Sequence, residues 1–369
     1  MMRGSIEHRL DAAFASPDIH QVKVPGEGVV AVVLAYNEAL RFPHFLQHYR
    51  QLGVAQFVVV DNNSADGTRA LLSDCDDVSV IRTDRPYRDH KSDWRQLICE
   101  RYLEDRWVIF PDVDELFVYP GWPDRSIIDL VHYLDAGQYQ ALFCPMVDMY
   151  PKGALADLKY AEGDNFIDAC PYFDGTGYRY CPLKGSHRKR YKTPSRQVFG
   201  GTRERLFHQD AKRPSTYFER ALLKHFFSMR SNAPETSIGR LADHLVFKLV
   251  KDALPYTAAI QSKIPLIKWR GDFKFSGGVH GIDKQIRVAS DWGALLHFKY
   301  LDDFQSKVAE AIDRKQHTAN AGHYLDYNTQ MARLMEEGLY AECSVKFTGT
   351  DSLMACGLMR SVEPHISAS

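Results

Sequence analysis

The sequence predicts an α/β fold built on a mostly parallel β-sheet that is flanked by helices. Short apolar runs rich in β-branched residues recur between residues 29 and 144, and such runs are typical of strands buried on both faces. Amphipathic helical patterns separate these runs, with short connections, which favours parallel strand pairing. Polar residues follow several of the runs, at the strand ends where open α/β sheets bind ligands.

The predicted strands and helices alternate in a regular order along the first part of the chain. Apolar residues in a helical pattern follow the first strand until Gly53, and Ser92 and Ser126 are suitable N-caps for two later helices. Because crossover connections are right-handed, the loops at the strand ends should meet at one edge of the sheet. The predicted strands are residues 29–35, 57–60, 78–81, 107–110 and 141–144.

The composition is that of a globular protein without a strong overall charge. The 369 residues are 45% hydrophobic with a net charge of −1, so no basic field indicates nucleic acid as a partner. No apolar run approaches the roughly 18 residues of a transmembrane helix. Seven cysteines, an odd number in a long chain, favour a reducing compartment. We therefore expect a cytoplasmic protein, and contact with the inner face of the membrane stays open.

Three acidic residues follow the predicted strand at residues 107–110, namely Asp112, Asp114 and Glu115. Carboxylates this close together repel one another unless a cation lies between them. Hard oxygen ligands suit Mg²⁺ or Mn²⁺, which proteins bind through one or two carboxylates together with substrate phosphates. The pattern predicts a metal–phosphate site, and the alternative is an acidic strand-to-loop junction at the surface.

Several motifs, taken in order, resemble glycosyltransferase family 2. Residues 35–38 read AYNE, residues 60–68 read VDNNSADGT, and residues 112–115 read DVDE. The second motif is similar to the family's VDDGSTDGT loop, from which Asn62 and Asn63 depart. Residues 148–150 (DMY) and 295–299 (LLHFK) make the family 2-like branch, which also resembles family 92, the better match. The resemblance covers roughly residues 28–330 and implies the GT-A fold.

The resemblance also implies an activity, a cofactor and a division of the chain. It implies inverting, metal-dependent sugar transfer from a nucleotide-sugar donor to a hydroxyl of a polysaccharide, lipopolysaccharide or other glycan, which could be lipid-linked. Mn²⁺ or Mg²⁺ would offset the charge that develops on the diphosphate. Residues 1–24 would be peripheral, and residues 301–369 a C-terminal helical extension. Between them, residues 25–300 would form the catalytic domain, with a nucleotide-sugar half (25–150) and an acceptor half (151–300).

The resemblance assigns site residues by their motifs. Asp112 and Asp114 would hold the metal, although in many GT-A enzymes only the second aspartate contacts the metal and the first holds the ribose. His297 would be the third metal ligand, and Glu115 either orients the ligands or begins the next turn. A UDP-sugar is the favoured donor, although Asn62 replaces an aspartate and would bind uracil more weakly. Lys91 and Arg95 share a helix face and could meet the diphosphate, or they lie in a solvated basic segment. The other residues assigned to the donor are Tyr36, Asn37, Glu38 and Asp61.

The general base for the acceptor hydroxyl is not evident, because no Glu-Asp pair of the family's type occurs in the second half. The candidates are Glu204, Asp148, Asp210 and His280, and His280 could instead bind a phosphate. The basic run at residues 186–192 is either a solvated loop or a contact for an anionic acceptor or lipid surface.

Two alternatives to a glycosyltransferase remain. One is a nucleotide- or sugar-binding module of the same fold that has lost catalysis, for which the missing Glu-Asp pair is the best argument. The other is a nucleotidyltransferase, but such enzymes normally carry a Gly-rich phosphate loop where residues 36–38 stand.

Overall fold

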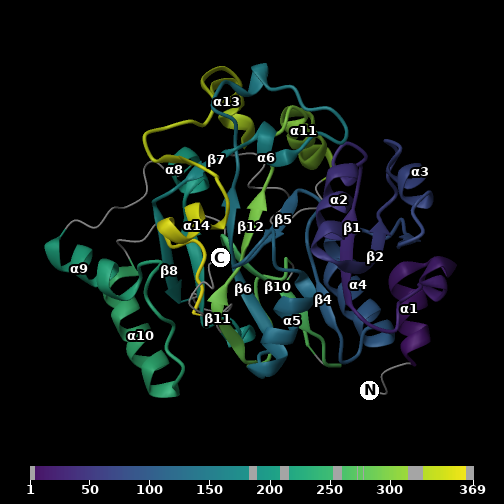
Figure 1. Cartoon of the computed structure of the whole chain (residues 1–369), viewed down its shortest axis with the longest axis horizontal. Coiled ribbons are helices and arrows are strands. Elements are labelled where there is room, and N and C mark those ends of the chain that lie inside the picture. The colour runs from purple at the N-terminus through teal and green to yellow at the C-terminus, as the bar shows by residue number, and fades with distance from the viewer. Residues whose placement is uncertain are drawn as a thin grey trace.

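The computed structural model describes residues 5–182, 189–207, 216–251, 260–271, 273–276, 278–314 and 327–362. A large, curled, mixed β-sheet forms the centre, with helices on both sides (Figure 1). Its strand order is β3-β2-β1-β4-β10-β6-β12-β5, and β11 pairs with β6. Among the described residues, no helix is both long and apolar enough to cross a bilayer.

Most strands of the sheet are parallel, as the sequence predicts. The first four run β3-β2-β1-β4 in parallel pairs, and β6 is parallel to both β11 and β12. Two strands run the other way: β10 lies between β4 and β6, and β5 pairs with β12 at the edge. The bounds are β1 Val29–Ala35, β2 Val54–Asp61, β3 Val78–Arg82, β4 Trp107–Ile109, β5 Glu115–Val118, β6 Ala141–Asp148, β10 Ser262–Lys268, β11 Val288–Trp292 and β12 Ala294–His297.

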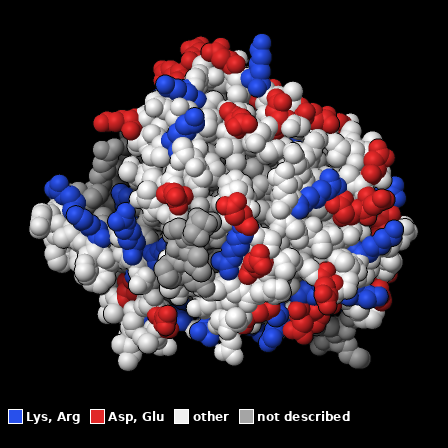
Figure 2. All heavy atoms as spheres, in the orientation of Figure 1, with Lys and Arg blue, Asp and Glu red and all other residues white. Residues whose placement is uncertain are grey.

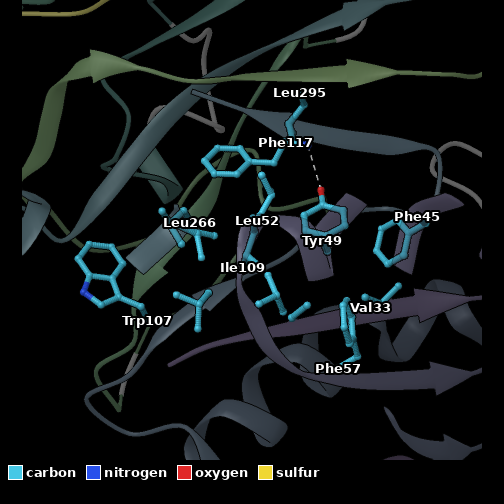
Figure 3. Packing of buried hydrophobic residues seen from close by; sticks show 14 of the residues in the cluster. Val33, Phe45, Tyr49, Leu52, Phe57, Trp107, Ile109, Phe117, Leu266 and Leu295 are labelled. Atoms are coloured by element: carbon cyan, nitrogen blue, oxygen red, sulfur yellow. Dashed lines mark hydrogen bonds between the residues drawn. The ribbon is translucent and has the colours of Figure 1, made fainter. Parts of the chain in front are cut away.

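Alternate side chains of β1 enter two separate cores, one on each face of the sheet. Val29, Ala31 and Val33 pack with α2 (Phe42–Leu52), α3 (Thr68–Ser73) and α5 (Ile127–Ala136). In that core the Tyr49 hydroxyl accepts a hydrogen bond of 3.1 Å from the amide of Phe117, drawn in Figure 3. Val30 and Val32 point to the other face, where they pack with α1 (Ile6–Phe14) and α4 (Tyr87–Tyr102). Burial on both faces explains why β1 reads as one continuous apolar run.

Two local predictions are wrong. The helix expected after Ser92 begins at Tyr87, directly after Pro86, whose φ of −60° suits a helix start. The first turn of this helix carries charged side chains, so it lacks the apolar periodicity from which a helix is predicted. Residues 151–235 show little periodicity in the sequence, which predicts loops with short strands, but they also hold helices. The elements from residue 151 to residue 235 are η2 Leu155–Asp157, α6 Phe166–Ala169, β7 Tyr172–Asp174, β8 Tyr178–Pro182, β9 Arg196–Gly200, α8 Thr202–Phe207 and α9 Tyr217–Phe226.

The segment after residue 300 is mainly helical but also adds a strand, because β13 pairs antiparallel with β7. Side chains from this segment, such as Phe347 and Leu353, belong to a core shared with β5, β6 and β12. The division of the chain at residues 24, 150 and 300 stays a prediction. The remaining elements are η1 Pro17–Gln21, α10 Ser237–Val250, α11 Phe304–Arg314, α13 Met331–Glu337, β13 Ser344–Lys346 and α14 Thr350–Cys356.

Candidate functional site

The three acids predicted from sequence lie where β4 ends and β5 begins. Asp112 and Asp114 are in the connecting loop, and Glu115 is the first residue of β5. Since β10 runs antiparallel to β4, its N-terminal end reaches the same edge of the sheet and brings Lys263 there. Since β12 is parallel to β6 with His297 opposite Asp148, these two side chains arrive together as well. Six charged or titratable groups therefore gather from four strands and one loop.

Lys263 lies between two of the acids. Its Nζ is 2.5 Å from Asp112 Oδ2 and 2.6 Å from Glu115 Oε1, and its side chain is only 3% exposed. Arg95 of α4 adds a second cation, with Nη2 3.2 Å from Asp112 Oδ1. Burial opposes ionisation of Asp112, but Lys263 and Arg95 outweigh it and hold its pKa below the usual value. Burial raises the pKa of Glu115, and Lys263 limits that rise.

A second group joins Asp114, His297 and Asp148. The imidazole Nε2 of His297 is 3.2 Å from Asp114 Oδ2, and its Nδ1 is 2.6 Å from Asp148 Oδ1. Burial lowers the pKa of His297, but the two carboxylates outweigh burial and raise it overall. Arg203 of α8 donates two hydrogen bonds of 2.9 and 2.8 Å to Asp148. Burial opposes ionisation of Asp148, and Arg203 with His297 reverses this and lowers its pKa.

The donor set fits a divalent cation between Asp114 and His297. Ligand atoms of Asp114, Glu115 and His297 all lie within 4.8 Å of one another. Octahedral Mg²⁺ or Mn²⁺ with bonds of about 2.1 Å places neighbouring ligand atoms roughly 3 Å apart, which matches the 3.2 Å between Asp114 and His297. A carboxylate on the other ring nitrogen, here Asp148, is the usual way in which proteins orient a metal-binding histidine.

The structure brings most of the predicted metal residues together but pairs them differently from the expectation. Asp114 and His297 are adjacent, whereas Asp112 lies against Arg95 and Lys263 and is outside the group that could hold a metal. Glu115, left open between orienting ligands and beginning a turn, begins a strand, and its Oε2 accepts a hydrogen bond of 3.1 Å from the Asp112 amide.

Helix α11 covers the predicted donor loops. The guanidinium carbon of Arg314 lies 3.2 Å from the ring centroid of Tyr36, and its Nη2 donates to Asn62 Oδ1 at 3.0 Å. Asn37 Nδ2 donates to Glu310 Oε1 at 2.6 Å, and Lys307 Nζ is 2.9 Å from Glu38 Oε1. Tyr36 and Asn62, both assigned to the donor from the sequence, are therefore in contact with one arginine.

The other predicted donor residues have partners of their own. Asp61 is buried and pairs with Arg69, with Nη2 3.0 Å from Oδ2. The amide nitrogen of Asn62 donates to the carbonyls of Thr83 and Arg85 at 3.1 and 2.9 Å. Burial lowers the pKa of Lys91, and Arg95 nearby adds to this effect.

The base candidates differ in their surroundings. His280 Nδ1 is 2.7 Å from the carbonyl oxygen of Ser262, and burial together with Lys263 lowers the pKa of His280 to about 4. Glu204 lies on α8 beside Arg203 and is half-buried. Asp148 is held by its two partners as described above. Asp210 and residues 186–188 of the basic run lie outside the described residues.

Of the cations of the site, sequence reasoning named Arg95 but missed the others, above all Lys263, Arg203 and Arg41. Arg41 is 4% exposed, and its Nη2 is 2.6 Å from Asp303 Oδ1 while its Nη1 is 3.3 Å from Glu38 Oε2. One signal for Lys263 was available, because a lysine directly before the apolar residues 264–267 requires a partner when it is buried.

Comparison with known proteins gives little. No family model matches the sequence, and no curated protein matches it. Among solved structures, the inositol-1-phosphate CTP transferase from T. maritima aligns with a TM-score of 0.21 and 16% sequence identity. The alignment covers 44% of this chain and 62% of that protein. A score this low supports no common fold, so the likeness to glycosyltransferase family 2 rests on the motifs alone.

Proposed function

We propose that this chain is a metal-dependent glycosyltransferase that moves a sugar from a nucleotide-sugar donor to a hydroxyl of a glycan. The observation that carries the proposal is the Asp114–His297 pair, supported by Asp148 and flanked by Lys263 and Arg95 at one edge of the sheet. This edge is where open α/β folds bind nucleotides. The order of the sequence motifs around it agrees with family 2-like glycosyltransferases and a GT-A fold.

Mn²⁺ or Mg²⁺ held by Asp114 and His297 would offset the negative charge of the departing nucleoside diphosphate. Asp148 accepts the Nδ1 proton of His297, which directs Nε2 toward Asp114. Arg203 keeps Asp148 ionised for this task. The proposed metal ligands are thus one carboxylate and one oriented imidazole, and not a pair of carboxylates.

Asp112 has a different task in the proposal, that of accepting a hydroxyl of the donor. Its side chain is 39% exposed while Arg95 and Lys263, which hold it, are 2% and 3% exposed. The two buried cations therefore fix the carboxylate in place, while part of it stays accessible to a ligand. The same two cations increase the local positive potential for a diphosphate.

The general base is sought among His280 and Glu204. Asp148 is a poor choice, because Arg203 and His297 already use its oxygens. At His280 the Nδ1–H donates to the Ser262 carbonyl, so the lone pair of that tautomer is on Nε2. We propose His280 as the first residue to replace in a search for the base.

The test is calorimetric titration and turnover with a panel of nucleotide sugars, with and without Mn²⁺, on the wild type and on Asp114→Asn. We expect Mn²⁺-dependent donor binding and hydrolysis in the wild type and their loss in the variant, with Asp124→Asn, an exposed acid before α5, unchanged. Equal metal affinity and turnover in Asp114→Asn would overturn the proposal. Turnover of a nucleoside triphosphate with a sugar phosphate, without sugar transfer, would indicate a nucleotidyltransferase instead.

A further inference from the structure

Helices α9 and α10 expose a row of large apolar side chains, which we call the apolar row. On α10 it consists of Ile238, Leu241, Leu245 and Leu249, which are 82%, 58%, 54% and 66% exposed. Their spacing of three and four residues puts them on one face of the helix. Tyr217 and Phe218 at the start of α9 are 85% and 62% exposed. These six are most of the strongly exposed large hydrophobic side chains in the described part of the chain.

The opposite faces of both helices are fixed in the protein. Leu223 and Phe247 belong to a core shared with β8 and β9. The side chain of Arg196 on β9, 4% exposed, pairs with Asp243 of α10 at 2.5 Å and donates to the Phe226 carbonyl of α9 at 2.7 Å. The apolar row therefore points outward on anchored helices, which project from one side of the body (Figure 1).

The exposed charges of the segment that carries the apolar row are mainly basic. In the described residues 216–251, exposed basic side chains outnumber exposed acidic ones. Glu235 is the sole exposed acid in this range. Figure 2 shows blue side chains among white surface at the left edge, over α9. The net charge of the chain is −1, so this excess of positive charge is local. The exposed basic residues are Arg220, Lys224, Arg230, Lys248 and Lys251.

We propose that α9 and α10 dock on an anionic lipid bilayer, with the apolar row in the acyl boundary and the basic side chains at the headgroups. An apolar stripe bordered by lysine and arginine is the pattern of helices that lie in the membrane interface. Each basic side chain near an anionic leaflet strengthens the attraction. A second copy of this chain fits less well, because a symmetric contact would bring the same basic residues together.

This proposal does not depend on the proposed function, since the apolar row contains none of the residues of the candidate site. The two are nevertheless linked in space. Strand β9, which anchors both helices through Arg196, leads directly into α8, which carries Arg203 at the site.

The experiment is co-sedimentation of the purified full-length chain with phosphatidylcholine vesicles, with or without about one third phosphatidylglycerol. We expect binding to the anionic vesicles that weakens at high salt. Leu241→Ser with Leu245→Ser should reduce the partition coefficient by about tenfold or more, because each leucine loses its buried apolar area. Val362→Ser is the matched control, since Val362 is 63% exposed but lies outside the apolar row. Circular dichroism verifies that the variants are folded.

Three results would overturn the proposal. The first is a wild type that stays in the supernatant with anionic vesicles. The second is a double variant that sediments as well as the wild type. The third is a dimer of the wild type in light scattering that is absent in the double variant, because the apolar row would then be an interface between copies.

A charge reversal, Lys224→Glu with Lys248→Glu, should reduce binding to anionic vesicles and leave any binding to neutral vesicles unchanged.

Discussion

Replacing Lys263 by methionine is the sharpest test of how the acidic loop is held. The change keeps the length of the side chain and its apolar stem but removes the ammonium that lies 2.5 Å from Asp112 and 2.6 Å from Glu115. Glu115 is fully buried, so its charge would lose its closest counter-ion without gaining water. Removing one partner of a buried ion pair typically costs about 3–5 kcal/mol of unfolding free energy.

The loss of unfolding free energy in Lys263→Met should depend on pH. The direction of this dependence follows from the pKa of Glu115. Burial already raises the folded-state pKa of Glu115 above its ordinary value, and loss of Lys263 raises it further. A carboxyl with a raised folded pKa binds more protons in the native state, so stability is present at low pH and falls as pH rises toward that pKa. The unfolding free energy of Lys263→Met should therefore be closest to that of the wild type at about pH 5, and the difference should be largest at about pH 8.

Urea denaturation of both proteins at the two pH values measures this effect. Lys268→Met is the matched control, because Lys268 lies on the same strand but its ion pair with Asp135 is 25% and 39% exposed. A surface pair of that kind is worth up to about 1 kcal/mol. Glu115→Gln in the Lys263→Met background should recover much of the loss. If Lys263→Met costs no more than Lys268→Met, the reasoning about a buried cation in this site is wrong.

Three further predictions concern the candidate site. Asp148→Asn should weaken Mn²⁺ binding by about 10–100-fold in calorimetry, because His297 loses the carboxylate that orients it, and unchanged affinity would contradict this. Arg314→Ala should tighten UDP binding by about fivefold, because the guanidinium and a base cannot share the ring face of Tyr36, and weaker binding would instead make Arg314 a donor contact. His280→Gln should gain stability relative to wild type as pH falls from 6.5 toward about 4. Over that window the imidazole of the wild type takes up a proton in the unfolded chain but not in the folded one, because its folded pKa is depressed. Parallel pH profiles in denaturation would refute this prediction.

The parts of the fold that could be predicted are those where burial acts on consecutive residues. β1 and β2 are covered on both faces, so their sequences are apolar throughout and mark strands without any alignment. β10 was not predicted, because Lys263 and Pro265 break up its apolar pattern. Both residues are compatible with a strand whose first residues lie at the site. α10 escaped because its apolar residues face two ways, inward at Phe247 and outward at Leu245.

The anionic half of the candidate site was predictable, and of the cationic half only Arg95 was. Acids that follow a strand stand next to one another in sequence, as Asp112 and Asp114 do, and a short motif describes them. Their counter-charges come from distant segments: Lys263 is 151 residues from Asp112, and Arg203 is 55 residues from Asp148. Only the sheet topology brings them together, through a strand inserted antiparallel between β4 and β6.

The position of Lys263 changes how the acidic motif should be interpreted. The resemblance allows the two aspartates different tasks, and their direct partners differ accordingly. Asp112 is in contact with the cations Lys263 and Arg95, whereas Asp114 is in contact with His297, which in its neutral form is a metal ligand. Burial opposes ionisation of Asp114, but His297, Lys299 and Arg41 outweigh it and lower its pKa. A metal bridging both aspartates would have to lie against the Lys263 ammonium or displace it. The charges therefore favour a division of labour in which Asp114 holds the metal and Asp112 holds the donor.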